Sequence, residues 1–181
     1  IRCFLVLSLF FSEVAGQTSS DPLSVIGDEF QQKWVDSVYS SLSLKQKVGQ
    51  LFVVQAFSNK NISHKNEILN DISNNKIGGV IFSNGTPHKQ VDLTNEFQSM
   101  SSVPLLIGMD AEWGLSMRLD STFSFPWNMT LGAIKDNELI KEVGHSVADH
   151  CKRIGVNFNF APVVDINTNP MNPIIGNRSF G

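Results

Sequence analysis

The chain has 181 residues, of which 41% are hydrophobic, and its 14 basic and 17 acidic residues give a formal net charge of −3. This length suits one domain of ordinary size, and the apolar fraction excludes general disorder. The basic residues form no cluster, so the charge pattern argues against nucleic-acid binding.

The N-terminus has the pattern of a signal peptide over residues 1–16. Arg2 precedes an apolar run at 4–11, and the small residues at 14–16 suit a cleavage site. The run is too short to span a bilayer, so we expect an exported protein, periplasmic or extracellular, with no integral membrane segment after cleavage. Residues 17–27 are polar and predict a disordered leader.

From residue 28 onward, helical and strand patterns alternate within what we expect to be one domain, 28–181. Ser43 and Gln46 have the spacing of a helix capping box, and Asp136 is placed to cap a later helix. The pattern predicts helices at 28–40, after Ser43, and at 63–75, 87–100 and 137–154, with strands at 51–56, 77–82, 105–109 and 156–161. Such alternation predicts an α/β fold with a parallel sheet, and it fits an open sheet or half of an eight-stranded barrel equally well.

Cysteine and histidine indicate no metal site and no internal disulfide in the mature chain. Cys3 lies in the predicted signal peptide, and Cys151 falls on an apolar helix face, where it is expected to pack. The histidines lack the spacing of a metal site, and we expect no metal and no cofactor. Glycosylation sequons begin at Asn61, Asn84, Asn128 and Asn177.

Charged side chains follow the last two predicted strands. Asp110 and Glu112 come directly after strand 105–109, Asp165 follows strand 156–161, and Arg178 lies in the loop beyond. The carboxyl ends of parallel strands share one edge of a sheet, where ligands commonly bind. Carboxylates and a guanidinium together suit a ligand rich in hydroxyl groups. The simpler alternative is that Asp110 only caps the turn after its strand.

Two tryptophans, Trp113 and Trp127, accompany these charged residues in the sequence. Either ring is large enough to stack on the apolar face of a sugar, but ordinary packing is the simpler expectation for both.

Five segments in a fixed order carry a resemblance to glycoside hydrolase family three. They are spread in that order over residues 41–181, which is nearly all of the mature chain, and comprise Leu42–Phe52, Gly78–Phe82, Pro104–Gly114, Gly155–Asp165 and Asn177–Gly181. The resemblance implies the N-terminal (β/α)8 barrel of an exported, retaining β-glycosidase that acts on an oligosaccharide or glycoside without a cofactor. The chain is then expected to contain the first half of that barrel, about four βα units.

The form of the third segment, with Glu112 and Trp113, is more similar to the β-N-acetylhexosaminidase branch, which implies cell-wall or chitin-type substrates. The resemblance assigns Asp110 and Arg178 to the sugar in the −1 subsite and gives Glu112, Trp113 and Asp165 supporting roles. The family's nucleophile and acid/base are expected beyond Gly181, so the chain alone should be inactive. The alternatives are a β-glucosidase or β-xylosidase of the same family and a non-catalytic glycan-binding barrel.

Overall fold

A computed structural model describes residues 28–181; the predicted signal peptide and leader lie outside the described residues. Helix α1 (Asp28–Ser41) crosses the division between a unit that ends at Ser37 and a second unit, residues 38–181. The second unit contains the sheet and every predicted site residue, and it is taken by itself below. Within residues 28–181, no helix is both long and apolar enough to cross a membrane.

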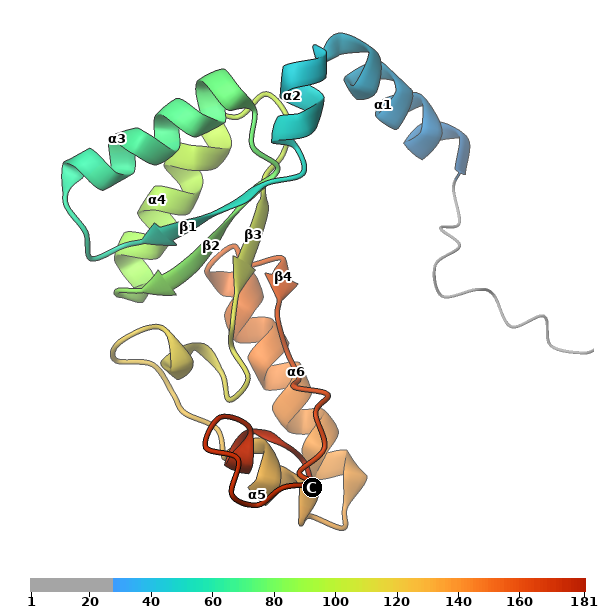
Figure 1. Cartoon of the computed structure of the whole chain (residues 1–181), viewed down its shortest axis with the longest axis vertical. Coiled ribbons are helices and arrows are strands. Elements are labelled where there is room, and N and C mark those ends of the chain that lie inside the picture. The colour runs from blue at the N-terminus through green and yellow to red at the C-terminus, as the bar shows by residue number, and fades with distance from the viewer. Residues whose placement is uncertain (1–27) are drawn as a thin grey trace, which may run out of the picture. The chain divides into compact units, whose positions relative to one another are not determined.

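Four parallel strands form one sheet in the order β1-β2-β3-β4 (Figure 1). Val80 of the second strand pairs with Val54 on one side and Ile107 on the other. The strands are β1 (Val53–Phe57), β2 (Gly79–Asn84), β3 (Leu106–Met109) and β4 (Phe158–Asn159). Each strand is joined to the next by a connection that contains a helix, which confirms the predicted parallel α/β sheet.

The helices are α2 (Leu44–Gly49), α3 (Ile62–Asn70), α4 (Pro87–Met100), α5 (Asn128–Gly132) and α6 (Asn137–Arg153). A π-helical turn at Asp71–Asn75 continues α3, and two short 3₁₀ turns occupy Leu115–Met117 and Gly176–Arg178. The short helix α5 and both 3₁₀ turns were not predicted from the sequence.

The predicted helix caps are present. At the start of α2, the Gln46 backbone N–H donates to Ser43 Oγ over 3.4 Å, and the Ser43 N–H donates to Gln46 Oε1 over 3.0 Å. Asp136 Oδ1 accepts from the Glu138 N–H at the start of α6. Gly155 lies just beyond the end of α6 with φ +76°, a conformation that side chains with a Cβ rarely adopt.

Strand β4 is shorter than predicted, and asparagine side chains supply part of its bonding to β3. Asn157 Oδ1 accepts from the Ile107 N–H over 2.8 Å, and Asn159 Oδ1 accepts from the Ala111 N–H over 3.0 Å. The backbone N–H groups of Ile107 and Ala111 are therefore satisfied by side chains.

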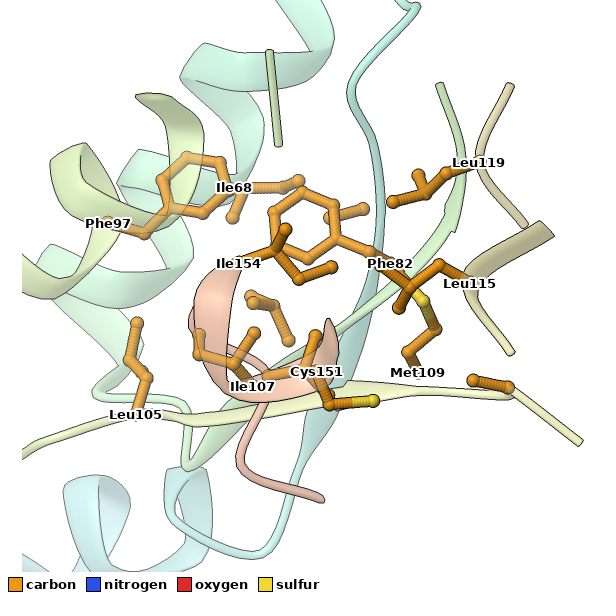
Figure 2. Packing of buried hydrophobic residues seen from close by; sticks show 14 of the residues in the cluster. Ile68, Phe82, Phe97, Leu105, Ile107, Met109, Leu115, Leu119, Cys151 and Ile154 are labelled. Carbon is orange, nitrogen blue, oxygen red and sulfur yellow. The ribbon is translucent and has the colours of Figure 1, made fainter. Parts of the chain in front are cut away.

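One face of the sheet carries the hydrophobic core. Figure 2 shows Phe82 and Ile107 from the strands packed with Ile68 of α3, Phe97 of α4 and Ile154, which directly follows α6. Side chains alternate across a strand, so this buried face takes every second residue of β2 and β3. Cys151 lies in the same cluster, and burial raises the pKa of its thiol, in keeping with its predicted packing role.

The opposite face of the sheet is apolar and exposed. Leu106 and Phe158 retain 52% and 47% of their surface, and Val53 and Phe160 are similarly open. Together with Gly108, these four side chains line a cavity of about 160 Å³. A parallel sheet with one uncovered apolar face is unusual, since such sheets are normally buried on both faces.

We expect Ile107→Ala to lower the free energy of unfolding of the 181-residue chain by about 2–5 kcal/mol, because it removes packed methyl groups from the core. Leu106→Ala, one residue earlier on the open face, is the matched control and should cost clearly less. Urea unfolding followed by circular dichroism measures both. Equal costs for the two substitutions would contradict the assignment of the faces.

Candidate functional site

The predicted acidic residues stand where β3 ends, and each meets a different arginine. Asp110 directly follows Met109, the last residue of β3, and its carboxylate forms an ion pair with Arg118. Glu112 pairs instead with Arg178, from the far end of the chain. The two acids, which stand on either side of Ala111 in the sequence, therefore bind different arginines.

The Glu112–Arg178 pair is the more extensively bonded of the two. Arg178 Nη2 lies 2.7 Å from Glu112 Oε1, and Nε lies 3.2 and 3.1 Å from the two carboxylate oxygens. The Glu112 side chain is only 3% exposed, whereas that of Arg178 is 31% exposed. Arg178 Nη1 also donates to the Ile174 carbonyl over 3.3 Å. The guanidinium is therefore oriented on one side and open to solvent on the other.

The charge environment favours the protonated form of Arg178. Its hydrogen bond to Glu112 raises the pKa of the guanidinium; burial opposes this effect, and the negative charges of Glu112, Asp110 and Asp165 raise the pKa further. Asp165 itself is exposed, and its carbonyl accepts from Ser179 Oγ over 2.8 Å. The site therefore gathers three carboxylates around two guanidinium groups.

A side-chain hydrogen bond and a close backbone approach hold the segment that carries Arg178 against α5. The Asn128 side-chain amide donates to the Arg178 carbonyl over 2.8 Å, and Asn128 is only 1% exposed. A Cβ at Gly132 would lie 2.0 Å from the Phe180 carbonyl oxygen, so this close approach requires glycine. Although Asn128 begins a sequon, the folded site leaves its side chain no access to a glycan.

The acidic loop is held from the neighbouring strand. The Ala111 N–H, between the two acids, donates to Asn159 Oδ1 at the end of β4. Ala111 is 1% exposed, so an unpaired N–H there would be costly. Asn159 thereby sets the path of the backbone from which both carboxylates project.

The tryptophans lie on each other. The rings of Trp113 and Trp127 are stacked with centroids 4.8 Å apart and planes 8° from parallel. The sequence left open whether either ring packs or binds a sugar, and the structure shows that Trp113 has an aromatic partner within the protein.

All five predicted site residues thus belong to one region at the carboxyl ends of β3 and β4. The structure pairs Arg178 with Glu112, however, and pairs Asp110 with Arg118, to which sequence reasoning assigned no role. A basic residue eight positions after Asp110 in the same loop was the available signal. Asn128 and Asn159 were also missed, because their bonds to residues about 50 positions away leave no local pattern.

The chemical character of the site is that of a polar binding surface. Its carboxylates can accept hydrogen bonds from hydroxyl groups, and the free N–H groups of the two arginines can donate to them. Among residues 28–181, no group of three or more His, Cys, Asp or Glu side chains is arranged to hold a metal ion.

A cavity of about 710 Å³ lies beside this region. It extends along the apolar side of α6, from Ile140 to Cys151, and reaches Glu112 and Asn128 at one end. Its lining is mainly aliphatic, so most of it does not share the chemistry of the charged cluster. The predicted sugar-binding residues Asp110 and Arg178 are absent from its lining.

Comparison with known proteins relates this arrangement to a family of enzymes. Residues 43–181 match the family described as glycosyl hydrolase family 3 N terminal domain. A β-N-acetylglucosaminidase/β-glucosidase of Cellulomonas fimi is 28% identical over 82% of the chain and 26% of its own length. β-Hexosaminidase A of Pseudoalteromonas piscicida is 36% identical over 60% of the chain and 20% of its own length.

The fold is also similar to that of solved structures. The solved structure of a β-glucoside phosphorylase, BglX, superposes with a TM-score of 0.77 and 26% identity, over 84% of this chain and 27% of that one. The chain therefore spans about a quarter of the length of these proteins, and its four parallel strands with their helices correspond to the first half of a (β/α)8 barrel. Because the family match covers residues 43–181, the chain belongs to glycosyl hydrolase family 3, and its relatives include β-hexosaminidases.

Proposed function

We propose that this chain is the N-terminal part of an exported, retaining exo-β-glycosidase that releases N-acetylhexosamine from cell-wall or chitin-type oligosaccharides. The observation that carries the proposal is the cluster of Asp110, Arg118, Glu112 and Arg178 at the end of β3 in a chain of this family. The β-hexosaminidase names of several relatives support the choice of sugar.

In this proposal Asp110 and Arg178 bind hydroxyl groups of the terminal sugar in the −1 subsite. Arg178 retains N–H groups that are not used by Glu112, and its side chain is partly open to solvent. Glu112 orients Arg178 and takes no part in the chemistry. Arg118 orients Asp110 in the same way, and Asp165 adds negative charge at the rim.

Bond cleavage is proposed to use residues that follow this chain in the longer protein. A retaining glycosidase needs a nucleophile and an acid about 5 Å apart, each free to act on the glycosidic bond. Asp110 and Glu112 are each held in an ion pair with an arginine, which suits binding better than nucleophilic attack or proton donation. We also propose that later strands cover the open apolar face of the sheet.

A β-glucosidase is the second candidate, because the Cellulomonas fimi relative carries both activities in its name and BglX acts on β-glucosides according to its own. We expect the longer protein to cleave an aryl β-N-acetylglucosaminide with a kcat/KM at least about tenfold above that of the aryl β-glucoside, which corresponds to roughly 1.4 kcal/mol of transition-state binding. Initial rates with both substrates test this.

The reverse preference would establish the glucosidase alternative, and binding of the sugar without any hydrolysis would establish a glycan-binding barrel. Proton NMR of the first product should show the β-anomer, as retention requires. The 181-residue chain alone should hydrolyse neither substrate, and turnover by it would contradict the placement of the catalytic groups.

We expect Glu112→Gln to reduce kcat/KM of the longer protein about 10- to 100-fold. The substitution keeps the shape of the side chain but removes the charge-assisted bonds that orient Arg178, which are worth about 1.5–3 kcal/mol. Glu142→Gln, at an exposed position on α6, is the matched control and should leave the rate unchanged. An unchanged kcat/KM in a folded Glu112→Gln protein would exclude the orienting role.

A further inference from the structure

The stacked tryptophans form a rigid aromatic surface at the edge of the site. The Trp113 carbonyl accepts from the Phe125 N–H over 3.0 Å, which closes the loop between the two rings. The Trp127 carbonyl accepts from the N–H groups of Thr130 and Leu131, over 2.9 and 3.1 Å, in the first turn of α5. The backbone is therefore held in place at both tryptophans.

Trp127 is open to solvent although it is held in place. The residue is 44% exposed, and Trp113 stacks on one face of its ring. The next residue, Asn128, is 1% exposed. A partly exposed indole stacked on a second one beside a polar site has the character of a ligand-binding surface.

Both tryptophans adjoin residues that hold Arg178. Trp113 directly follows Glu112, which binds the guanidinium, and Trp127 directly precedes Asn128, which binds the Arg178 carbonyl. The stack therefore joins the two elements that fix this arginine. We therefore expect a ligand held by Arg178 to lie near this aromatic surface.

We propose that the Trp113–Trp127 stack is a binding platform for the second sugar of the substrate, on the aglycone side of the sugar held by Asp110 and Arg178. This inference rests on the proposed function. A pyranose ring presents a face of C–H groups that packs against an indole, while its hydroxyl groups stay in water. Trp127 supplies the contact face, and Trp113 supports it from behind.

The experiment compares the longer protein with its Trp127→Ala, Trp127→Phe and Trp34→Ala variants. Trp34 is an exposed tryptophan of α1 and serves as the matched control. For the β-linked disaccharide of N-acetylglucosamine we expect Trp127→Ala to lower kcat/KM about 3- to 10-fold, the range of a single aromatic contact. The methyl β-glycoside lacks a second sugar, so Trp127→Ala should cleave it with an unchanged kcat/KM. Trp127→Phe keeps an aromatic ring and should lose less kcat/KM on the disaccharide than Trp127→Ala.

Equal loss with both substrates, or no loss with either, would overturn the platform while leaving the glycosidase proposal in place. Binding of the hydrolysis-resistant S-linked disaccharide, measured by calorimetry, gives a second readout that needs no turnover. Trp127→Ala should weaken this binding and leave that of N-acetylglucosamine unchanged. If no glycoside is hydrolysed, the proposed function fails, and the disaccharide measurement still decides the platform.

A third measurement needs no change at Trp127. In the Trp34→Phe variant of the 181-residue chain, whose remaining tryptophans are Trp113 and Trp127, the S-linked disaccharide should protect tryptophan fluorescence from acrylamide quenching, whereas N-acetylglucosamine should protect it much less. Equal protection by the two sugars, or none by either, would contradict stacking of a second sugar on Trp127.

Discussion

The ion pair between Glu112 and Arg178 is the interaction on which the site depends, because it joins residues 66 positions apart in the chain. One partner is buried and the other partly open. Removing water from a carboxylate is expensive unless its oxygens are bonded, and three contacts to Arg178 meet that need. Such a pair adds little net stability. Any arrangement that breaks it leaves a buried charge without a partner, so the pair disfavours alternative arrangements of the site.

Asparagine side chains build the frame around that pair. Asn159 positions the backbone between the two acids, and Asn128 positions the backbone of the arginine. Both bonds are partly buried, and an unsatisfied amide in such a place would cost about 1–3 kcal/mol. The ends of β3, β4 and the last segment are thus held together by side-chain-to-backbone bonds, where regular sheet pairing has already ended.

Local signals predicted the elements well, and contacts distant in sequence account for what was missed. The capping box at Ser43 and the cap at Asp136 involve residues two or three positions apart, so the sequence contains the whole interaction. The parallel order of the strands likewise followed from alternating patterns. The role of Asn128 had no such signal, because its partner lies 50 residues away. Its immediate neighbours instead form a glycosylation sequon.

The site residues were predicted as a group, but their pairing was not. Placing Asp110, Glu112 and Arg178 at the same sheet edge required only the direction of the strands. Which carboxylate meets which guanidinium depends on the loop geometry that Ala111 and Asn159 set, and Arg118 enters through the 3₁₀ turn at Leu115–Met117 that no pattern indicated.

The open apolar face of the sheet and the charged cluster are connected through their exposure to solvent. Leu106 and Phe158 present apolar surface to solvent on the strands that lead to Asp110 and the Asn159 contact. If later strands of the barrel cover these side chains, water is removed from the region beneath the cluster, and the effective dielectric constant there falls. Hydrogen bonds from Asp110 and Arg178 to a sugar then strengthen. Covering the apolar face would therefore stabilise the barrel and improve sugar binding by the same change in solvation.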